Sequence, residues 1–165
     1  MLFTMFLAIV FCAAMALMLI SCVAFIQDNR FFSSAPQEAR EVLVQRENEL
    51  FYGARAIGWT LFLISVLMIL GVGVIAVWDG FRSGFTFWQF FLRFALIFTI
   101  YKICDMVLID KFLLLKFHFF QHYYPEAADV MEGRKYGFNL KSQLLKLFVI
   151  LPAVSALAAW ICTLF

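Results

Sequence analysis

The chain has 165 residues, of which 65% are hydrophobic and 15% are charged, and 22 of the residues are Phe. A soluble domain of this size would expose large apolar patches to water, so the composition predicts an integral membrane protein. The net charge is only +2 and the basic residues form no run, which argues against nucleic acid as a partner. The length suits one domain, residues 1–165, with about four spans.

The first predicted span covers residues 2–26 and contains no charged residue, so it can cross a bilayer with some tilt. No Lys or Arg precedes this apolar run, and we therefore interpret it as a retained helix rather than a signal peptide. Ala8, Cys12 and Ala16 recur every four residues. They form a ridge of small side chains against which another helix can pack closely.

Residues 27–58 are polar and form the first predicted cytoplasmic segment. Ser34 and Gln37 resemble a capping box, and Pro36 would stand in the first turn of a helix. Apolar residues then recur at helical spacing while charged residues take the other faces. The pattern predicts an amphipathic surface helix that leads into the second span.

The remaining spans are predicted at residues 59–78, 93–111 and 144–161. The second span has a Trp at each end, as expected for the two aromatic belts, and a short glycine-containing turn joins it to the third. Residues 112–143 form a second cytoplasmic segment. The predicted fold is an all-α, four-helix transmembrane bundle with a cytoplasmic amphipathic helix between the first two spans.

Most of the Lys and Arg residues lie in the two polar segments, 27–58 and 112–143. The positive-inside rule therefore places both segments in the cytoplasm and both termini outside. We expect a multi-pass protein of the bacterial inner membrane.

The third span carries charges where a membrane helix tolerates them least. Arg93 and Lys111 are about 27 Å apart along a helix, which suits side chains that snorkel to opposite interfaces. Lys102 is then at the midpoint and Asp105 one turn further, with Tyr101 four residues before Asp105. A charge near the bilayer centre costs about 2.5–3.5 kcal/mol, so we expect Lys102 and Asp105 to face the protein interior and to pair.

Two interpretations of this pair remain open. It is either an ion pair that holds the helices in register, or a proton relay or counter-ion for a ligand head group. Asp110 follows near the inner interface, where it either binds a cation or head group or is simply solvated.

No cofactor is expected, and a zinc or iron site is the alternative. His118 and His122 are four residues apart, so a helix would place both imidazoles on one face, with Glu126 as an added oxygen ligand. The surrounding Phe and Tyr residues favour interfacial histidines instead. Arg134 and Lys135 are candidates for contact with anionic lipid head groups.

Asp105-x4-Asp110 near the end of the third span, followed by Pro125-Glu126 and an aromatic-rich loop, resembles a group of uncharacterised small bacterial membrane proteins. The resemblance covers about the last 70 residues and implies a four-helix inner-membrane protein. It implies no activity and no functional residue.

Three functions follow as hypotheses. The first is binding or transport of a lipid-like or ionic ligand at the charged site of the third span. The second is a non-catalytic accessory or assembly subunit of a membrane complex, and the third is a metal-dependent intramembrane enzyme. The expected partners are membrane lipid and either a second copy of the chain or another membrane subunit.

Overall fold

The computed structural model describes residues 1–32, 41–46, 48–131 and 140–164. Every regular element among these residues is a helix. In chain order they are α1 (Leu2–Ile20), a π-helix (Ser21–Ile26), a 3-10 helix (Asn29–Phe32), α3 (Ala54–Arg82), α4 (Phe87–Cys104), a π-helix (Asp105–Lys116), α5 (Phe119–Tyr123), a 3-10 helix (Pro125–Ala127), α6 (Ala128–Met131), α7 (Leu140–Leu145), a π-helix (Lys146–Ile150) and α8 (Leu151–Cys162).

Three helices are long and apolar enough to cross a membrane: Leu2–Ile26, Ala54–Arg82 and Ser142–Cys162. They contain the spans predicted at residues 2–26, 59–78 and 144–161. The span predicted at residues 93–111 lies within α4 and the π-helix that continues it, but this helix is not among the three. A fourth span therefore stays a prediction.

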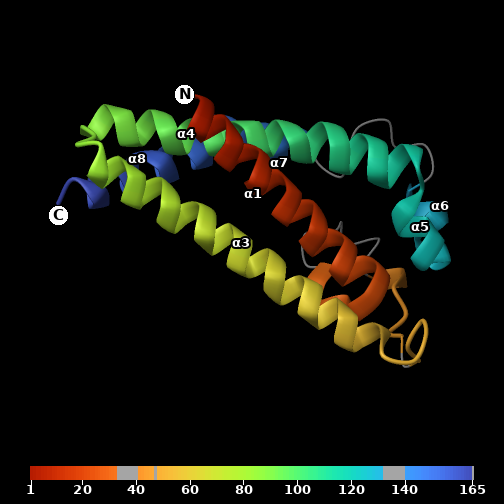
Figure 1. The fold of residues 1–165 in the computed structure, drawn as a ribbon. Coiled ribbons are helices and arrows are strands. Elements are labelled where there is room, and N and C mark those ends of the chain that lie inside the picture. Colours follow the sequence, from red (N-terminus) through yellow and green to blue (C-terminus); the bar gives the residue numbers. More distant parts are fainter. Residues whose placement is uncertain (33–40, 47, 132–139, 165) are drawn as a thin grey trace.

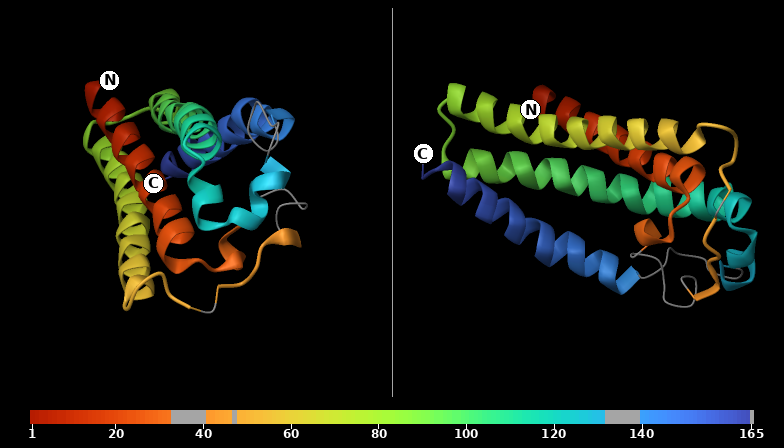
Figure 2. Two further views of the ribbon diagram at one scale, coloured as in Figure 1. Left: turned by 90° about the vertical axis from the view of Figure 1, so that its right-hand side faces the viewer. Right: turned by 90° about the horizontal axis from the view of Figure 1, so that it is seen from below.

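The four long helices lie in a row, in the order α3, α1, α4 and α8. In Figure 1, α1 runs between α3 and α4, and the end-on view of Figure 2 places α8 on the other side of α4. α8 packs on α4 and makes few contacts with α1 or α3. The described helices thus form an open row, and a closed four-helix bundle is not shown.

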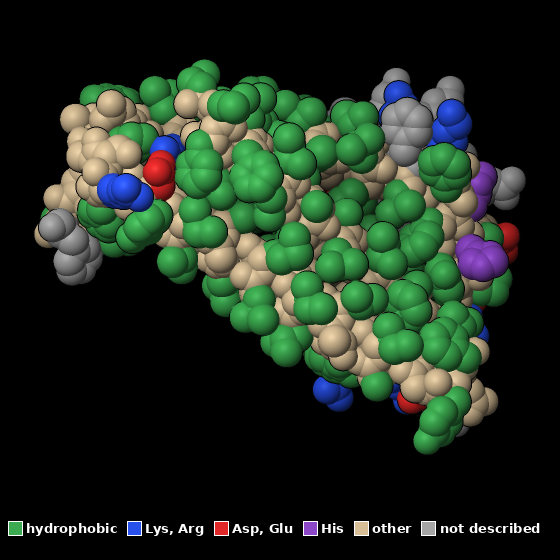
Figure 3. All heavy atoms as spheres, in the orientation of Figure 1, with side chains coloured by type: hydrophobic (Ala, Val, Ile, Leu, Met, Phe, Trp, Pro, Cys, Tyr) green, Lys and Arg blue, Asp and Glu red, His purple; other side chains and the backbone are tan. Residues whose placement is uncertain are grey.

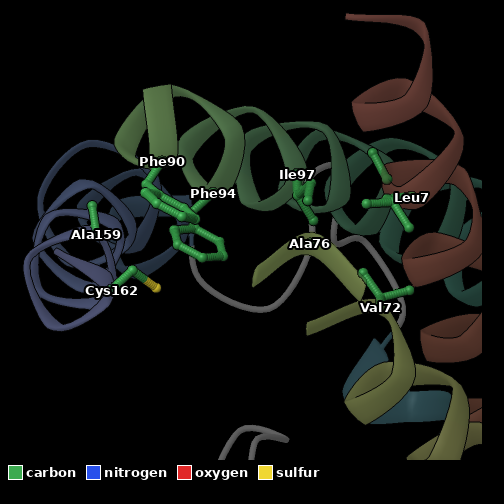
Figure 4. Close-up of a cluster of buried hydrophobic side chains, with 9 residues drawn as sticks. Leu7, Val72, Ala76, Phe90, Phe94, Ile97, Ala159 and Cys162 are labelled. Carbon is green, nitrogen blue, oxygen red and sulfur yellow. The ribbon is translucent and has the colours of Figure 1, made fainter. Parts of the chain in front are cut away.

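A shared core forms where α3 turns into α4, and Figure 4 shows its side chains. Phe90 and Phe94 of α4 extend toward α8, while Ile97 lies toward α1 and α3. All four helices contribute buried residues to this cluster: Leu7, Ala8, Val72, Ala76, Phe90, Phe94, Ile97, Ala159 and Cys162. Small side chains at Ala8, Ala76 and Ala159 let the helices approach closely.

Two glycines of α3 mark places where another part of the chain comes very close. A Cβ atom at Gly80 would overlap the Phe90 ring, and one at Gly58 would lie 2.8 Å from Ile26 and Phe25. Such contacts are far inside van der Waals distance, so a larger residue at either place would force its neighbours to shift. Gly80 fixes the α3–α4 end of the molecule, and Gly58 joins the start of α3 to the end of the first helix.

The amphipathic helix predicted before the second span is not formed in its described part. Before α3 begins at Ala54, only Glu41 and Val42 of this part are helical, and residues 43–53, apart from 47, contain bends and a turn but no helix. The Leu43 carbonyl accepts a hydrogen bond from Asn29 Nδ2 (3.1 Å), and the Val44 N–H donates to Glu126 Oε1 (3.2 Å). Tertiary partners therefore take the backbone groups that a helix would pair internally. The predicted helix start, with Ser34 and Pro36, lies outside the described residues.

Apolar side chains cover the middle of the face shown in Figure 3, and charged side chains gather toward its ends. The C-terminus lies beside the α3–α4 turn and the N-terminus lies on the same half of the molecule (Figure 1). The described polar segments, 27–32, 41–46, 48–53 and 117–131, lie at the opposite end.

Candidate functional site

Lys102 and Asp105 pair within one continuous helix. Lys102 lies in the last turn of α4, and Asp105 begins the π-helix that follows it. The three-residue spacing puts both side chains on one face, and Lys102 Nζ lies 2.5 Å from Asp105 Oδ2. The Lys102 side chain is 7% exposed and that of Asp105 is 18% exposed. The predicted pairing is therefore present, with Lys102 buried and Asp105 only partly buried.

Side chains of α1 lie beside the Lys102–Asp105 pair. The Tyr101 ring lies edge-on to Phe11 of α1, with 5.2 Å between the ring centroids. Cys12, one residue further along α1, interacts with Cys104 and lies within electrostatic range of Asp105. The Asp105 carboxylate thus lies near the thiols of Cys12 and Cys104 and near the ring contact between Tyr101 and Phe11. These surroundings are less polar than water.

A second buried ion pair was not predicted. Arg93 was expected to snorkel to the outer interface, and this expectation is wrong because its side chain is only 7% exposed and points into the protein. Arg93 Nη2 lies 2.8 Å from Asp79 Oδ2, Arg93 Nη1 donates to the Ala76 carbonyl (2.9 Å), and the guanidinium lies over the Phe85 ring, 4.2 Å from its centroid. One signal was available in the sequence: Asp79 and Arg93 lie on either side of a short turn, and a short turn between two helices makes them antiparallel neighbours.

The two charged pairs have different roles in the geometry. The Arg93–Asp79 pair crosses between α4 and α3 near their turn and therefore braces the hairpin. The Lys102–Asp105 pair lies within one helix and so cannot tie two helices to each other. It neutralises two charges locally, beside α1.

Comparisons with protein-family models, with curated proteins and with solved structures give no match to this chain. The resemblance drawn from the Asp105-x4-Asp110 spacing therefore stays a prediction.

The other predicted site residues are scattered. The Asp110 side chain, Arg134 and Lys135 lie outside what the structure describes, so their predicted contacts remain predictions. Lys111 is exposed, as expected for an interfacial residue.

His118 and His122 are exposed and lie one helical turn apart, since the His122 N–H donates to the His118 carbonyl (2.9 Å). Glu126 points to Arg46, with Oε2 2.8 Å from Arg46 Nη2, and its Oε1 accepts from the Val44 N–H. Within the described ranges, no group of three or more His, Cys, Asp and Glu side chains is placed to hold a metal ion. The zinc or iron site remains an untested alternative.

The Arg46–Glu126 pair belongs to a second cluster at the polar end of the molecule. There Arg46 also donates to the Tyr123 carbonyl (3.3 Å) and lies 5.7 Å from the centroid of the Tyr124 ring. Tyr124 is fully buried, and this burial raises the pKa of its hydroxyl. The apolar members of this cluster are Val23, Leu43, Phe120, Tyr124 and Ala127.

Proposed function

We propose that this protein is a small multi-pass protein of the bacterial inner membrane that binds or transports a lipid-like or ionic ligand at Lys102 and Asp105. The observation that carries the proposal is the buried Lys102, paired with the partly buried Asp105, in a long helix that packs between two helices able to span a membrane. Charges in such a place are costly, and they are rare outside ligand, ion and proton pathways.

The unequal exposure of the two side chains supports a binding role. Lys102 is nearly enclosed, while part of the Asp105 carboxylate remains accessible. A cationic group of a ligand can approach Asp105, and an anionic group can replace Asp105 as the partner of Lys102. In both cases each charged side chain keeps a partner of opposite charge. Ligand binding therefore does not leave Lys102 or Asp105 as an uncompensated charge between the helices.

The proposed orientation has four spans, including the Phe87–Lys116 helix, with the polar segments in the cytoplasm and both termini outside. It is supported by the cations Arg30, Arg46 and Arg55 at the polar end, against Arg82 near the α3–α4 turn. Trp78, Trp88 and Trp160 are all well exposed and lie at positions suited to the outer aromatic belt.

Native mass spectrometry of protein extracted in a mild detergent tests the binding role. We expect a non-covalent adduct of defined mass on the wild type and its loss from the Lys102→Met/Asp105→Leu double variant. Lys111→Met is the matched control, because Lys111 is an exposed cation on the same helix, and it should keep the adduct. An adduct retained by the double variant would exclude this pair as the binding site.

A second candidate function, an accessory or assembly subunit, is favoured by one feature of the fold. Only 11% of the most apolar part of Ser142–Cys162 is buried within the chain, because α8 packs mainly on α4. Another membrane helix could therefore pack on α8. Native mass spectrometry would show a heteromeric complex or a second copy in that case, and a monomer would favour the ligand-binding role.

A further inference from the structure

A pocket of about 430 Å³ opens at the polar end of the molecule, apart from the Lys102–Asp105 pair. Its lining comes from the end of the first helix, the chain after it, and the first turns of α3: Ile26, Asp28, Gln45, Arg46, Arg55 and Trp59. A volume of this order is typical of sites for small ligands. Two arginines, one aspartate and one tryptophan thus line a single concave site.

The backbone builds this pocket in a defined way. Gln27 has a left-handed conformation (φ 54°) that ends the first helix and turns the chain toward Asp28. Asp28 Oδ1 then accepts a hydrogen bond from the Arg30 N–H (2.9 Å), which orients the carboxylate. On the other side, the close approach of Gly58 to Ile26 holds the start of α3 against the end of the first helix.

Both arginines are anchored by protein groups. Arg46 is held by Glu126 and by the Tyr123 carbonyl, and Arg55 Nη2 donates to the Arg46 carbonyl (2.5 Å). A guanidinium has five N–H donors, so an arginine oriented by one or two of them can offer others to a phosphate. Arg55 also lies in the first turn of the 29-residue helix α3, whose dipole favours a negative charge at this end.

We propose that this pocket binds a phosphate group that carries a nearby ammonium, the chemistry of a phosphoethanolamine head group. Arg46 and Arg55 match the phosphate, while Asp28 and Trp59 match the ammonium. This inference depends on the protein lying in a membrane and does not depend on a ligand at Lys102 and Asp105.

The surface beside the pocket indicates a lipid as the source of this group. Trp59 is half exposed, and exposed apolar side chains continue from it along one face of α3 at helical spacing: Leu63, Leu67, Leu70 and Val74. An acyl chain attached to a head group in the pocket could lie along this stripe. Trp59 itself is of the residue type that favours the membrane–water interface.

The test is lipid binding by the full chain in detergent, measured by native mass spectrometry with added phosphatidylethanolamine, phosphatidylglycerol or diacylglycerol. Phosphatidylethanolamine should bind best and diacylglycerol, which lacks the phosphate, least. Arg55→Gln should weaken both phospholipids by about tenfold, since it removes a charge-assisted hydrogen bond. Arg82→Gln, the same change at an exposed position near the other end of α3, should leave both unchanged.

Asp28→Asn tests the contact with the ammonium separately from the contact with the phosphate. It also gives a second test of the site in case Arg55→Gln fails to fold. The asparagine oxygen can still accept the Arg30 N–H, so the fold should persist, while the preference for phosphatidylethanolamine over phosphatidylglycerol should disappear. Equal binding of diacylglycerol and the phospholipids, or an unchanged preference in Asp28→Asn, would overturn the proposal.

Two further measurements complete the test. The first shows whether the bound phosphoethanolamine group belongs to a lipid or to a soluble molecule, and the second shows whether this site is independent of Lys102 and Asp105. If added free phosphoethanolamine displaces the lipid at a similar concentration, the site takes a soluble ligand. If it does not displace the lipid, the ligand of the site is a lipid. The Lys102→Met/Asp105→Leu variant should bind phosphatidylethanolamine normally. Loss of that binding would show that the head group depends on the intramembrane pair, against an independent site.

Discussion

Arg93 of α4 lies 2.8 Å from the carboxylate of Asp79 on α3 and is 7% exposed, so the turn between these helices is closed by a buried ion pair. Removing one member of such a pair leaves a buried charge uncompensated. Asp79→Asn should therefore destabilise the protein, near the lower end of the roughly 3–5 kcal/mol typical of buried pairs, because Asp79 is itself 30% exposed.

The free energy of unfolding in detergent measures this effect. Arg82→Gln is the matched control, since Arg82 is exposed and makes a cation–π approach to Trp78, 5.5 Å from the ring centroid. It should change stability by less than about 0.5 kcal/mol. Equal effects of the two substitutions would mean that the Arg93–Asp79 contact contributes nothing specific.

Gly80→Ala should also destabilise the α3–α4 end, by about 1–3 kcal/mol, because the new methyl group would collide with the Phe90 ring. Gly73 lies in the same helix, and a methyl group added there would meet no atom within 4 Å. Gly73→Ala should therefore be neutral or stabilising by up to about 1 kcal/mol through helix propensity. Thermal unfolding of the two variants gives the comparison. A destabilised Gly73→Ala with an unaffected Gly80→Ala would contradict the packing described for this end.

Hydropathy predicted the long helices well because membrane helices satisfy their own backbone and depend little on distant partners. The helices Leu2–Ile26 and Ala54–Arg82 contain the predicted spans, and the Lys102–Asp105 pair followed from helical spacing alone. Local patterns of this kind can be read from one segment at a time.

Features that depend on distant residues could not be predicted in this way. Leu43 and Val44 lie in a stretch with helical periodicity, yet Asn29 and Glu126 bind their backbone groups. Arg93 looked interfacial because its partner Asp79 is on another helix. The pocket is built by three stretches of the chain, around Ile26, Arg46 and Arg55, and no local pattern indicates the contact of Gly58 with Ile26 that helps to form it.

Tyr124 should make stability depend on pH above about pH 10. Burial raises the pKa of its hydroxyl above the unfolded value of about 10, so the neutral form is favoured in the folded state. The stabilisation is fully present below pH 10. It is lost as pH rises further, because the unfolded chain then releases the proton more readily, with a slope of at most about 1.36 kcal/mol per pH unit.

Unfolding free energies at pH 9, 10 and 11 test this, with pH values chosen to bracket the unfolded pKa of about 10. Tyr124→Phe should remove part of the decline above pH 10. Tyr52→Phe should not, since Tyr52 is fully exposed. An identical decline in wild type and Tyr124→Phe would show that this hydroxyl does not titrate differently in the two states.

The proposed topology predicts the accessibility of single cysteines in intact cells. With Cys12, Cys22, Cys104 and Cys162 replaced, a cysteine at Gln45 should be shielded from an impermeant thiol reagent and one at Ser83 should be labelled. Both positions are exposed on the protein surface, so burial cannot explain a difference between them. The reverse labelling would overturn the orientation.

The coupling free energy between Lys102 and Asp105 tests most directly whether α4 and the π-helix that continues it carry a self-compensated charged site. It is obtained from the unfolding free energies of Lys102→Met, Asp105→Leu and the double variant. Asp105→Leu should cost about 3–5 kcal/mol because it leaves the buried Lys102 charge alone, and Lys102→Met should cost less because Asp105 is 18% exposed. The double variant should recover much of that loss. If both single variants are as stable as the wild type, the two side chains reach water or lipid head groups, and the proposed intramembrane site does not exist.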